Sequence, residues 1–244
     1  RMKREIRLIQ TLLKGDAGMH ECEGESHLVQ LLHRDEGFIN LEHAIPVTLS
    51  AFGPKTLGYC GAECDGHLTW NASLEMMRDA REKIARAAKD ADRNPADVPS
   101  KAIYPLAVLR PGETSSSPGV LESLAPFITN LLHVMCEWDE GLLPSDTTIT
   151  DHVRRYREYV ATLPSDRRHL ILHEGHLVYT REDEREFLVP EVAEVAAMIG
   201  EPDAVIENIR ELEAEGLSHF AFQVTDDPVA QMRYFAETVM RRYH

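Results

Sequence analysis

Short apolar runs alternate along the chain with longer segments in which apolar residues recur every three or four positions. A short apolar run rich in β-branched residues is typical of a buried strand, and the longer spacing is typical of a helix with one buried face. The runs predict strands at residues 45–49, 67–70, 102–109 and 219–224. The helical spacing predicts helices at residues 2–13, 55–64, 73–90, 118–133, 147–163, 189–199, 202–216 and 228–241.

Residues 45–71 contain the clearest repeat of this pattern: a strand, a tight turn, a helix, a second strand and a polar turn. Strands that alternate with helices build a parallel sheet, so the sequence predicts an α/β fold. Ligands of such folds bind at the carboxyl ends of the strands. In this stretch those ends are residues 50–53 and 69–73, and we expect a ligand there.

Two segments lack a clear period. Residues 16–44 hold scattered glycines and short apolar patches, which indicates a long connection, and residues 182–186 form a charge run, which indicates a solvated helix face. His67 and His219 lie inside predicted strands, and we expect both to be satisfied within the core or at the strand ends.

Composition narrows the range of partners. The chain has 244 residues, of which 43% are hydrophobic, and a formal net charge of −15. This charge argues against nucleic acid and anionic membranes as partners, and no uninterrupted apolar run approaches the roughly 18 residues of a membrane span. The four cysteines are scattered, which indicates a reducing, cytoplasmic setting. Cys60 and Cys64 share a predicted helix face, and we interpret them as buried thiols.

Three passages resemble the bacterial luciferase-like family of flavin- and deazaflavin-dependent oxidoreductases. The first is residues 8–15, a leucine-rich helix end followed by Lys-Gly. The second is IPVTLSAFGPKTLGYCGAECDGHLTWN, with a proline-led strand, a small-residue turn, Gly-Pro, a helix and Asp-Gly before the next strand. The third is residues 199–224, with Gly-x-Pro, an amphipathic helix, Gly-Leu and a phenylalanine-rich strand.

The resemblance implies a (β/α)8 TIM barrel, of which this chain supplies the later strands. The four predicted strands would be strands five to eight, and residues 111–198 would be a helical insertion between the last two strands of a single domain, 1–244. Because a half barrel leaves unpaired strand edges, we expect it to pair with the missing N-terminal half, from the same protein or a second chain. The resemblance also allows a homodimer.

The family's cofactor, FMN or a deazaflavin coenzyme, would place its phosphate over the two strand-end turns. Small residues let backbone N–H groups approach an anion, and a helix N-terminus adds partial positive charge. The cofactor-binding residues predicted on this basis are Ser50, Ala51, Phe52, Gly53, Thr69, Trp70 and Asn71. The competing interpretation is that these are only tight turns that cap helices. The catalytic residue is unknown, and the resemblance implies that it belongs to the missing half.

A second group of polar residues lies in the segment His169-x3-His173-Glu174-Gly175-His176. Histidine and carboxylate side chains bind metals or transfer protons. The spacing is not HExxH and no distant fourth ligand is evident, so we predict no metal site. We consider His173, Glu174 and His176 for the mouth of a substrate pocket, with an exposed structural role as the alternative.

Together these features predict a flavin- or deazaflavin-dependent oxidoreductase that acts on a small organic substrate by hydride transfer or monooxygenation. One alternative is a TIM-barrel lyase or isomerase with a phosphorylated substrate, although no lysine lies inside a predicted strand to form a Schiff base. The other is a truncated, non-catalytic flavin-binding protein.

Overall fold

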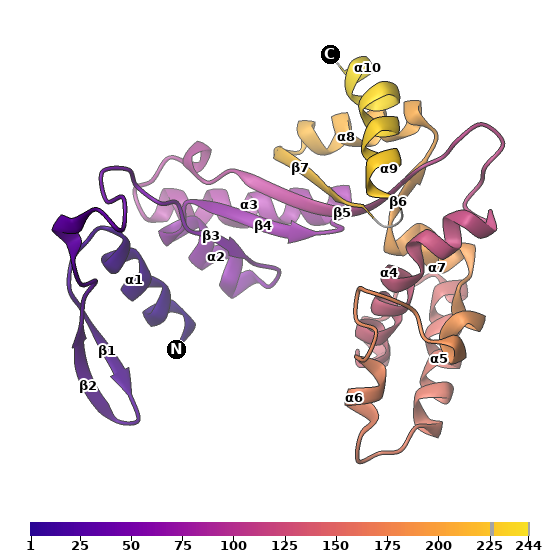
Figure 1. The fold of residues 1–244 in the computed structure, drawn as a ribbon, viewed down its shortest axis with the longest axis horizontal. Helices are drawn as coiled ribbons and strands as arrows, with labels where there is room; N and C mark the ends of the chain where they lie inside the picture. The colour runs from indigo at the N-terminus through magenta and orange to yellow at the C-terminus, as the bar shows by residue number, and fades with distance from the viewer. Residues whose placement is uncertain (225–226, 244) are drawn as a thin grey trace. The chain divides into compact units, whose positions relative to one another are not determined.

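The computed structural model describes residues 1–224 and 227–243, which divide into two compact units. The N-terminal unit comprises Arg1–Thr69 and Arg78–Lys101, and the C-terminal unit comprises Trp70–Met77 and Ala102–His244. The chain therefore passes between the units three times, once within strand β4 (Gly66–Trp70), once within helix α3 (Leu74–Asp90) and once within strand β5 (Ser100–Val108). Figure 1 follows the chain through these elements.

The N-terminal unit begins with helix α1 and an antiparallel hairpin and continues into a parallel strand pair. Its other elements are α1 (Met2–Leu13), β1 (Gly18–Cys22), β2 (Glu25–Val29), β3 (Thr48–Ser50) and α2 (Pro54–Glu63). In the parallel pair Thr48 lies opposite Gly66 and Ser50 lies opposite Leu68. The predicted strand–helix–strand order of residues 45–70 is confirmed, although β3 is shorter than the apolar run that predicted it.

The core of the N-terminal unit lies where α2 packs against α3. Its buried residues are Ala51, Leu57, Tyr59, Cys60, Cys64, Ala80, Ile84 and Val98. Cys60 and Cys64 are free thiols with no exposed surface, which confirms their prediction as buried residues. At Gly61 helix α2 lies close to the backbone of α3, because a β-carbon there would lie 2.3 Å from the backbone oxygen of Ile84.

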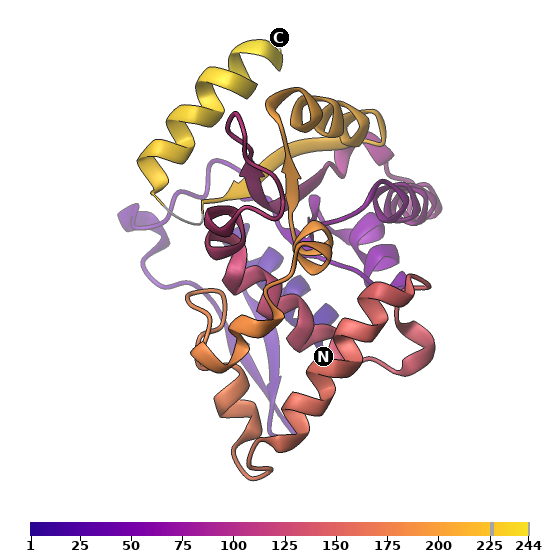
Figure 2. The same cartoon turned by 90° about the vertical axis from the view of Figure 1, so that its right-hand side faces the viewer.

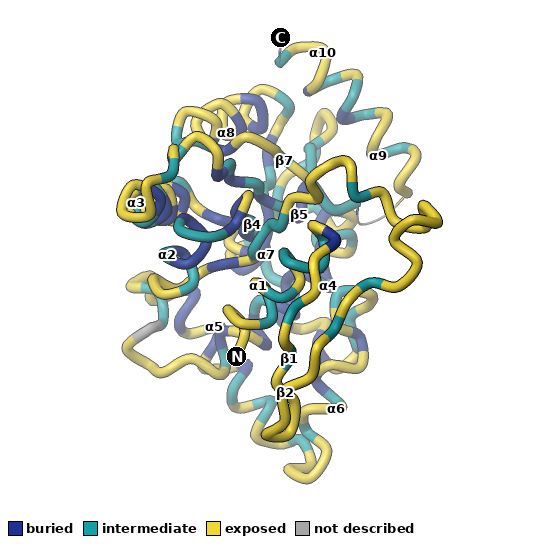
Figure 3. Tube along the Cα trace, turned by 90° about the vertical axis from the view of Figure 1, so that its left-hand side faces the viewer, coloured by how far each residue is buried: buried dark blue, intermediate teal, exposed yellow. Residues whose placement is uncertain are grey.

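The prediction of a long connection at residues 16–44 is wrong for its first half, which forms the β1–β2 hairpin. Figure 3 shows this hairpin exposed along most of its length. With neither face buried, the strands carry no apolar alternation from which they could be predicted. The turn residues Glu23 and Gly24 both have positive φ angles (52° and 86°), as a tight hairpin turn requires.

The C-terminal unit combines the later strands with most of the helices. Its elements, besides the shared ones, are α4 (Pro118–Cys136), α5 (Thr147–Thr162), α6 (Arg168–Leu172), α7 (Pro190–Ala196), β6 (Met198–Gly200), α8 (Pro202–Ala214), β7 (Leu217–Gln223), α9 (Pro228–Phe235), a π-helical turn (Ala236–Met240) and α10 (Arg241–Tyr243). β5 pairs in parallel with β6 and also pairs with β7. The predicted α/β fold with parallel strands is thus confirmed.

Helices α4, α5 and α7 form the main core of the C-terminal unit. They lie against one another within it (Figure 2). Buried residues of this core include Leu124, Ile128, Leu132, Val153, Tyr156, Phe187 and Val192. By length and composition α4 could cross a membrane, whereas we expected no segment to approach a membrane span. However, 56% of its apolar window is buried inside the protein, as in the core helix of a globular fold.

Two further expectations for this unit are corrected. β7 is not a fully buried strand: Ser218, His219 and Ala221 are exposed, so His219 is not a core residue. The end of the predicted helix 189–199 is the short strand β6, because the helix stops at Ala196 and the chain extends alongside β5. Both segments are rich in apolar residues. Composition alone does not show whether such a segment is buried, or where a helix ends and a strand begins.

Candidate functional site

The first strand-end turn, Ser50–Gly53, lies in the N-terminal unit between β3 and α2. Its backbone is fixed at Ala51, which is buried. The Ala51 N–H donates to the carbonyl of Leu68 at 3.2 Å, and the Ala51 carbonyl accepts from Nε2 of His67 at 2.9 Å. The sequence prediction that His67 is a satisfied core residue is confirmed. Its burial lowers its pKa, although the bond to Ala51 opposes this shift, so the ring remains neutral.

The other side chains of this turn face solvent at the start of a helix. Ser50, Phe52 and Gly53 are exposed, and Phe52 retains 58% of its accessible surface. Gly53 is the N-cap of α2, and its carbonyl accepts from the N–H groups of Thr56 and Leu57. Pro54 is the first residue of the helix and has no N–H, so Lys55 supplies the one earlier helical N–H, and it has no intrahelical acceptor. This N–H and the helix dipole favour an anion. The turn is therefore exposed at the start of a helix, and its backbone is held at Ala51 by Leu68 and His67.

The second strand-end turn makes hydrogen bonds within the protein that were not predicted from the sequence. Thr69, the last residue of the N-terminal unit here, is 4% exposed. In the C-terminal unit, the indole Nε1 of Trp70 donates to Oε1 of Gln223 at 3.3 Å. The Asn71 amide Nδ2 donates to the Val195 carbonyl at 2.8 Å, and its backbone N–H donates to Ile103 at 2.8 Å. These three donors thus have acceptors within the protein, and a ligand would have to compete for them.

A cavity in the C-terminal unit marks a position that sequence reasoning missed. It encloses about 220 Å³ at the carboxyl ends of β5 and β7 and beside the start of α9. Leu106 and Val108 supply apolar walls, while Arg110 and Tyr234 supply a guanidinium and a phenol. The Arg110 guanidinium lies 5.8 Å from the centre of the Tyr234 ring. In α/β folds this end of the strands is where ligands bind, so the cavity is a candidate substrate pocket.

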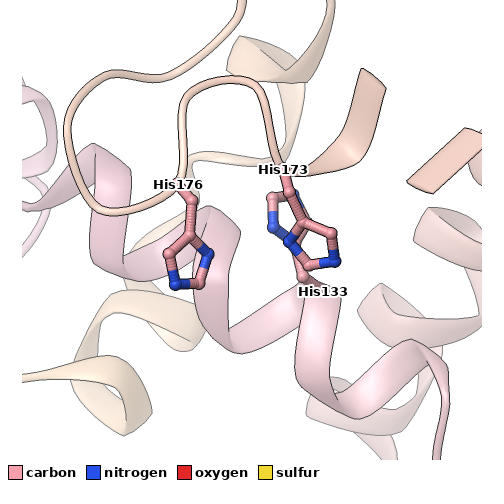
Figure 4. Close-up of side chains that lie close together, drawn as sticks. All are labelled: His133, His173 and His176. Atoms are coloured by element: carbon pink, nitrogen blue, oxygen red, sulfur yellow. The ribbon is translucent and has the colours of Figure 1, made fainter. Parts of the chain in front are cut away.

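Of the three residues considered in the histidine-rich segment, two lie close together and the third does not. His173 and His176 lie in the loop after α6, with ring centres 5.5 Å apart, and both are exposed. Glu174 points elsewhere and pairs with Arg181 at 3.1 Å. The third converging ring is His133 of α4, whose centre lies 5.7 Å from that of His173 (Figure 4). Sequence reasoning gave His133 no role, because it is forty positions away in the chain.

Behind His133 lies a buried hydrogen-bonded group. His133 Nε2 lies 2.8 Å from Oε1 of Glu184, and the Tyr156 hydroxyl donates to the same oxygen. Burial and the bond to Glu184 raise the pKa of Tyr156, so the phenol stays protonated as the donor. Glu184 retains only 2% of its accessible surface, so the prediction that residues 182–186 form a solvated helix face is wrong at this position. The segment is a 3₁₀ turn, Glu182–Phe187, that turns Glu184 inward.

Solved structures show the same fold at low sequence identity. A coenzyme F420-dependent tetrahydromethanopterin reductase from Methanopyrus kandleri is 17% identical, with a TM-score of 0.61 over 99% of this chain and 64% of that chain. An F420-dependent secondary alcohol dehydrogenase is 13% identical, with a TM-score of 0.58 over 96% of this chain and 59% of the other.

A flavin enzyme is similar to the same degree. The oxygenating constituent of 3,6-diketocamphane monooxygenase from Pseudomonas putida, in complex with FMN, is 14% identical, with a TM-score of 0.53 over 97% of this chain and 61% of the other. The chain thus spans about three fifths of the length of these structures. No curated protein sequence gives a significant match. A family model described as luciferase-like monooxygenase matches residues 1–219, and the chain therefore belongs to the luciferase-like monooxygenase family.

Proposed function

We propose that this chain is part of a flavin-type oxidoreductase and holds the phosphate of its cofactor at the Ser50–Gly53 turn. Membership of the luciferase-like family supports a cofactor of this type. The names of similar structures include both F420 and FMN, so both cofactors are candidates. We propose the deazaflavin F420 as the first to test, because the Ser-Ala-x-Gly-Pro turn resembles the deazaflavin branch of the family and two of these structures are F420-dependent.

The geometry of the first turn is the observation on which the proposal depends. The Ala51 N–H is bonded to Leu68 and the Ala51 carbonyl is bonded to His67, so the turn does not need to be ordered by the ligand. Ser50 offers a hydroxyl, and the start of α2 offers the N–H of Lys55 and partial positive charge, whereas Pro54 has no N–H. A phosphate that binds here gains hydrogen bonds without a large ordering cost.

The bound cofactor would supply the hydride or oxygen chemistry, and the protein would supply binding, orientation and exclusion of water. We propose that the apolar walls of the cavity beside β5 and β7 receive a small organic substrate, with Arg110 and Tyr234 at its polar side. We assign proton transfer to no residue of this chain. The substrate itself, a homodimer, a cytoplasmic location and further strands that complete the barrel stay predictions.

The test uses a pair of variants that separate binding from folding. A β-carbon at Gly53 would meet only Thr56 Oγ1, at 3.9 Å, so a side chain fits there. Asn and Asp are both good N-cap residues, so Gly53→Asn and Gly53→Asp should both fold at least as well as the parent chain. Only Asp places a negative charge where the phosphate would lie.

We expect the full-length chain to bind F420 or FMN in equilibrium dialysis and fluorescence titration. Gly53→Asn should change the dissociation constant by less than about threefold, whereas Gly53→Asp should weaken binding by at least about tenfold through repulsion at short range. The difference should shrink as salt is added. Two results would refute the proposal: a parent chain that binds neither cofactor, or equal binding by the two variants.

A further inference from the structure

We propose that His133, His173 and His176 form a binding site for a divalent transition-metal ion of the Zn²⁺ class. Each ring offers one nitrogen, and these three nitrogens all lie within 4.8 Å of one another. Two come from the exposed loop after α6, and one comes from the buried face of α4 (Figure 4). The site lies wholly within the C-terminal unit, whereas the Ser50–Gly53 turn belongs to the N-terminal unit.

The state of His133 is the strongest sign of a ligand. Its Nε2 is bonded to Glu184, and a carboxylate only accepts, so Nε2 carries the proton. In the neutral ring Nδ1 then holds a lone pair. This Nδ1 atom is buried and has no hydrogen-bond partner among the residues that the structure describes. Buried polar atoms normally have a partner, so an ion at Nδ1 would satisfy an atom that otherwise costs stability.

Glu184 supplies the outer contact that metal-binding histidines usually have. A ligating imidazole commonly donates its second N–H to a carboxylate, which fixes the ring and increases its basicity. Here Glu184 accepts from His133 and is itself held by the Tyr156 hydroxyl. A structural His–Glu pair would need the same contacts, but it would not require two further histidines within reach of the His133 ring.

Closing the site needs only small movements of exposed side chains. In a tetrahedral site with Zn–N bonds of 2.0–2.1 Å, neighbouring nitrogens lie about 3.3 Å apart. His173 and His176 are exposed and can rotate toward His133. Between the two histidines, the His176 N–H donates to the His173 carbonyl at 3.3 Å. The two ring centres lie 5.5 Å apart across this backbone bond. The loop that follows is closely packed, because the Gly175 carbonyl accepts from Val178 and Tyr179 and a β-carbon at Gly175 would lie 2.3 Å from the Tyr179 oxygen.

The donor set indicates which ions bind. Three imidazoles suit Zn²⁺, Cu²⁺, Ni²⁺ and Co²⁺, whereas Mg²⁺ and Ca²⁺ prefer oxygen ligands. Glu174, the nearest carboxylate in the segment, is paired with Arg181. Three protein ligands leave a fourth position open for water or another small ligand.

The experiment measures metal binding by the full-length chain, prepared without a polyhistidine tag. We expect one equivalent of Zn²⁺ in calorimetry, and one equivalent of Co²⁺ with the visible absorption of tetrahedral coordination. Mg²⁺ at millimolar concentration should not displace either ion. The variants His173→Ala and His176→Ala change exposed side chains and should fold normally. Each should weaken Zn²⁺ binding at least about tenfold, and the double variant should abolish the Co²⁺ spectrum.

His169→Ala is the matched control, because His169 is an exposed histidine of the same segment outside the cluster. It should bind Zn²⁺ as the parent chain does. Glu184→Gln keeps a hydrogen-bond acceptor and should weaken binding about 10- to 100-fold, as loss of an outer carboxylate does. No stoichiometric Zn²⁺ uptake by the parent chain, or equal uptake by the His173/His176 double variant, would overturn the proposal.

Discussion

Two glycines of α2 should respond to the same substitution with opposite signs. Glycine inside a helix costs about 0.8–1 kcal/mol relative to alanine, so Gly→Ala in a helix normally stabilises. At Gly58 a β-carbon would meet nothing within 4 Å, and Gly58→Ala should gain most of this amount. At Gly61 the β-carbon would lie 2.3 Å from the Ile84 oxygen and 3.0 Å from the Ile84 carbonyl carbon.

The contact at Gly61 cannot be relieved by a rotamer change, because the opposing atoms are backbone atoms of α3. Ordinary contact begins near 3.4 Å, so the two helices would have to separate by about 1 Å. That shift disturbs the packing of Leu57 and Ile84 in the buried core. Overpacking of this kind costs about 1–3 kcal/mol. Since both variants gain the same helix propensity, the difference between their stabilities should equal this steric cost.

The assay compares urea unfolding of Gly58→Ala, Gly61→Ala and the parent chain by far-ultraviolet circular dichroism. Hydrogen exchange of peptides from α2 and α3 then locates the change within the N-terminal unit. We expect Gly61→Ala to be less stable than Gly58→Ala by about 1–3 kcal/mol and to exchange faster in both helices. If the two variants are equally stable, the close approach of α2 and α3 described above is incorrect.

Three further predictions test individual buried groups. Because burial lowers the folded-state pKa of His67, the unfolded chain binds a proton at this histidine at higher pH than the folded chain does. The free energy of unfolding should therefore fall as the pH drops below about 6.5. His67→Gln should reduce this pH dependence, measured by urea unfolding, by up to about 1.4 kcal/mol per pH unit. Glu184→Ala leaves His133 and Tyr156 without their acceptor and should cost about 1–3 kcal/mol per unpaired group, whereas Glu184→Gln should retain much of the stability measured by thermal unfolding. Asn71 has a φ angle of 45°, which glycine adopts without strain. Asn71→Gly should therefore lose only the hydrogen bond to Val195, about 0.5–1.5 kcal/mol of unfolding free energy, and Asn71→Ala should lose more. Equal losses in the two variants would contradict the backbone strain.

Elements with one buried face were predictable, and elements with no buried face were not. The apolar stripes of α3, α5 and α8 gave these helices nearly their observed bounds, since each packs one side against a core. The β1–β2 hairpin has no such stripe and was missed. Burial of Glu184 was also missed, because a charged residue is buried only when its partners arrive from elsewhere in the chain. Those partners, His133 and Tyr156, lie on two other helices.

The two strand-end turns show the same limit at the level of the candidate site. Residue type alone gave both turns candidate donors. Local sequence predicted the start of a helix after the first turn, because the turn and the helix are adjacent in the chain. At the second turn, the donors of Trp70 and Asn71 are bonded to Gln223 and Val195, which are more than a hundred positions away. Whether a polar group is available to a ligand depends on such distant acceptors. The first turn is therefore the stronger candidate for a phosphate-binding site. At the second turn, the hydrogen bonds of Trp70 and Asn71 hold the end of β4 within the C-terminal unit.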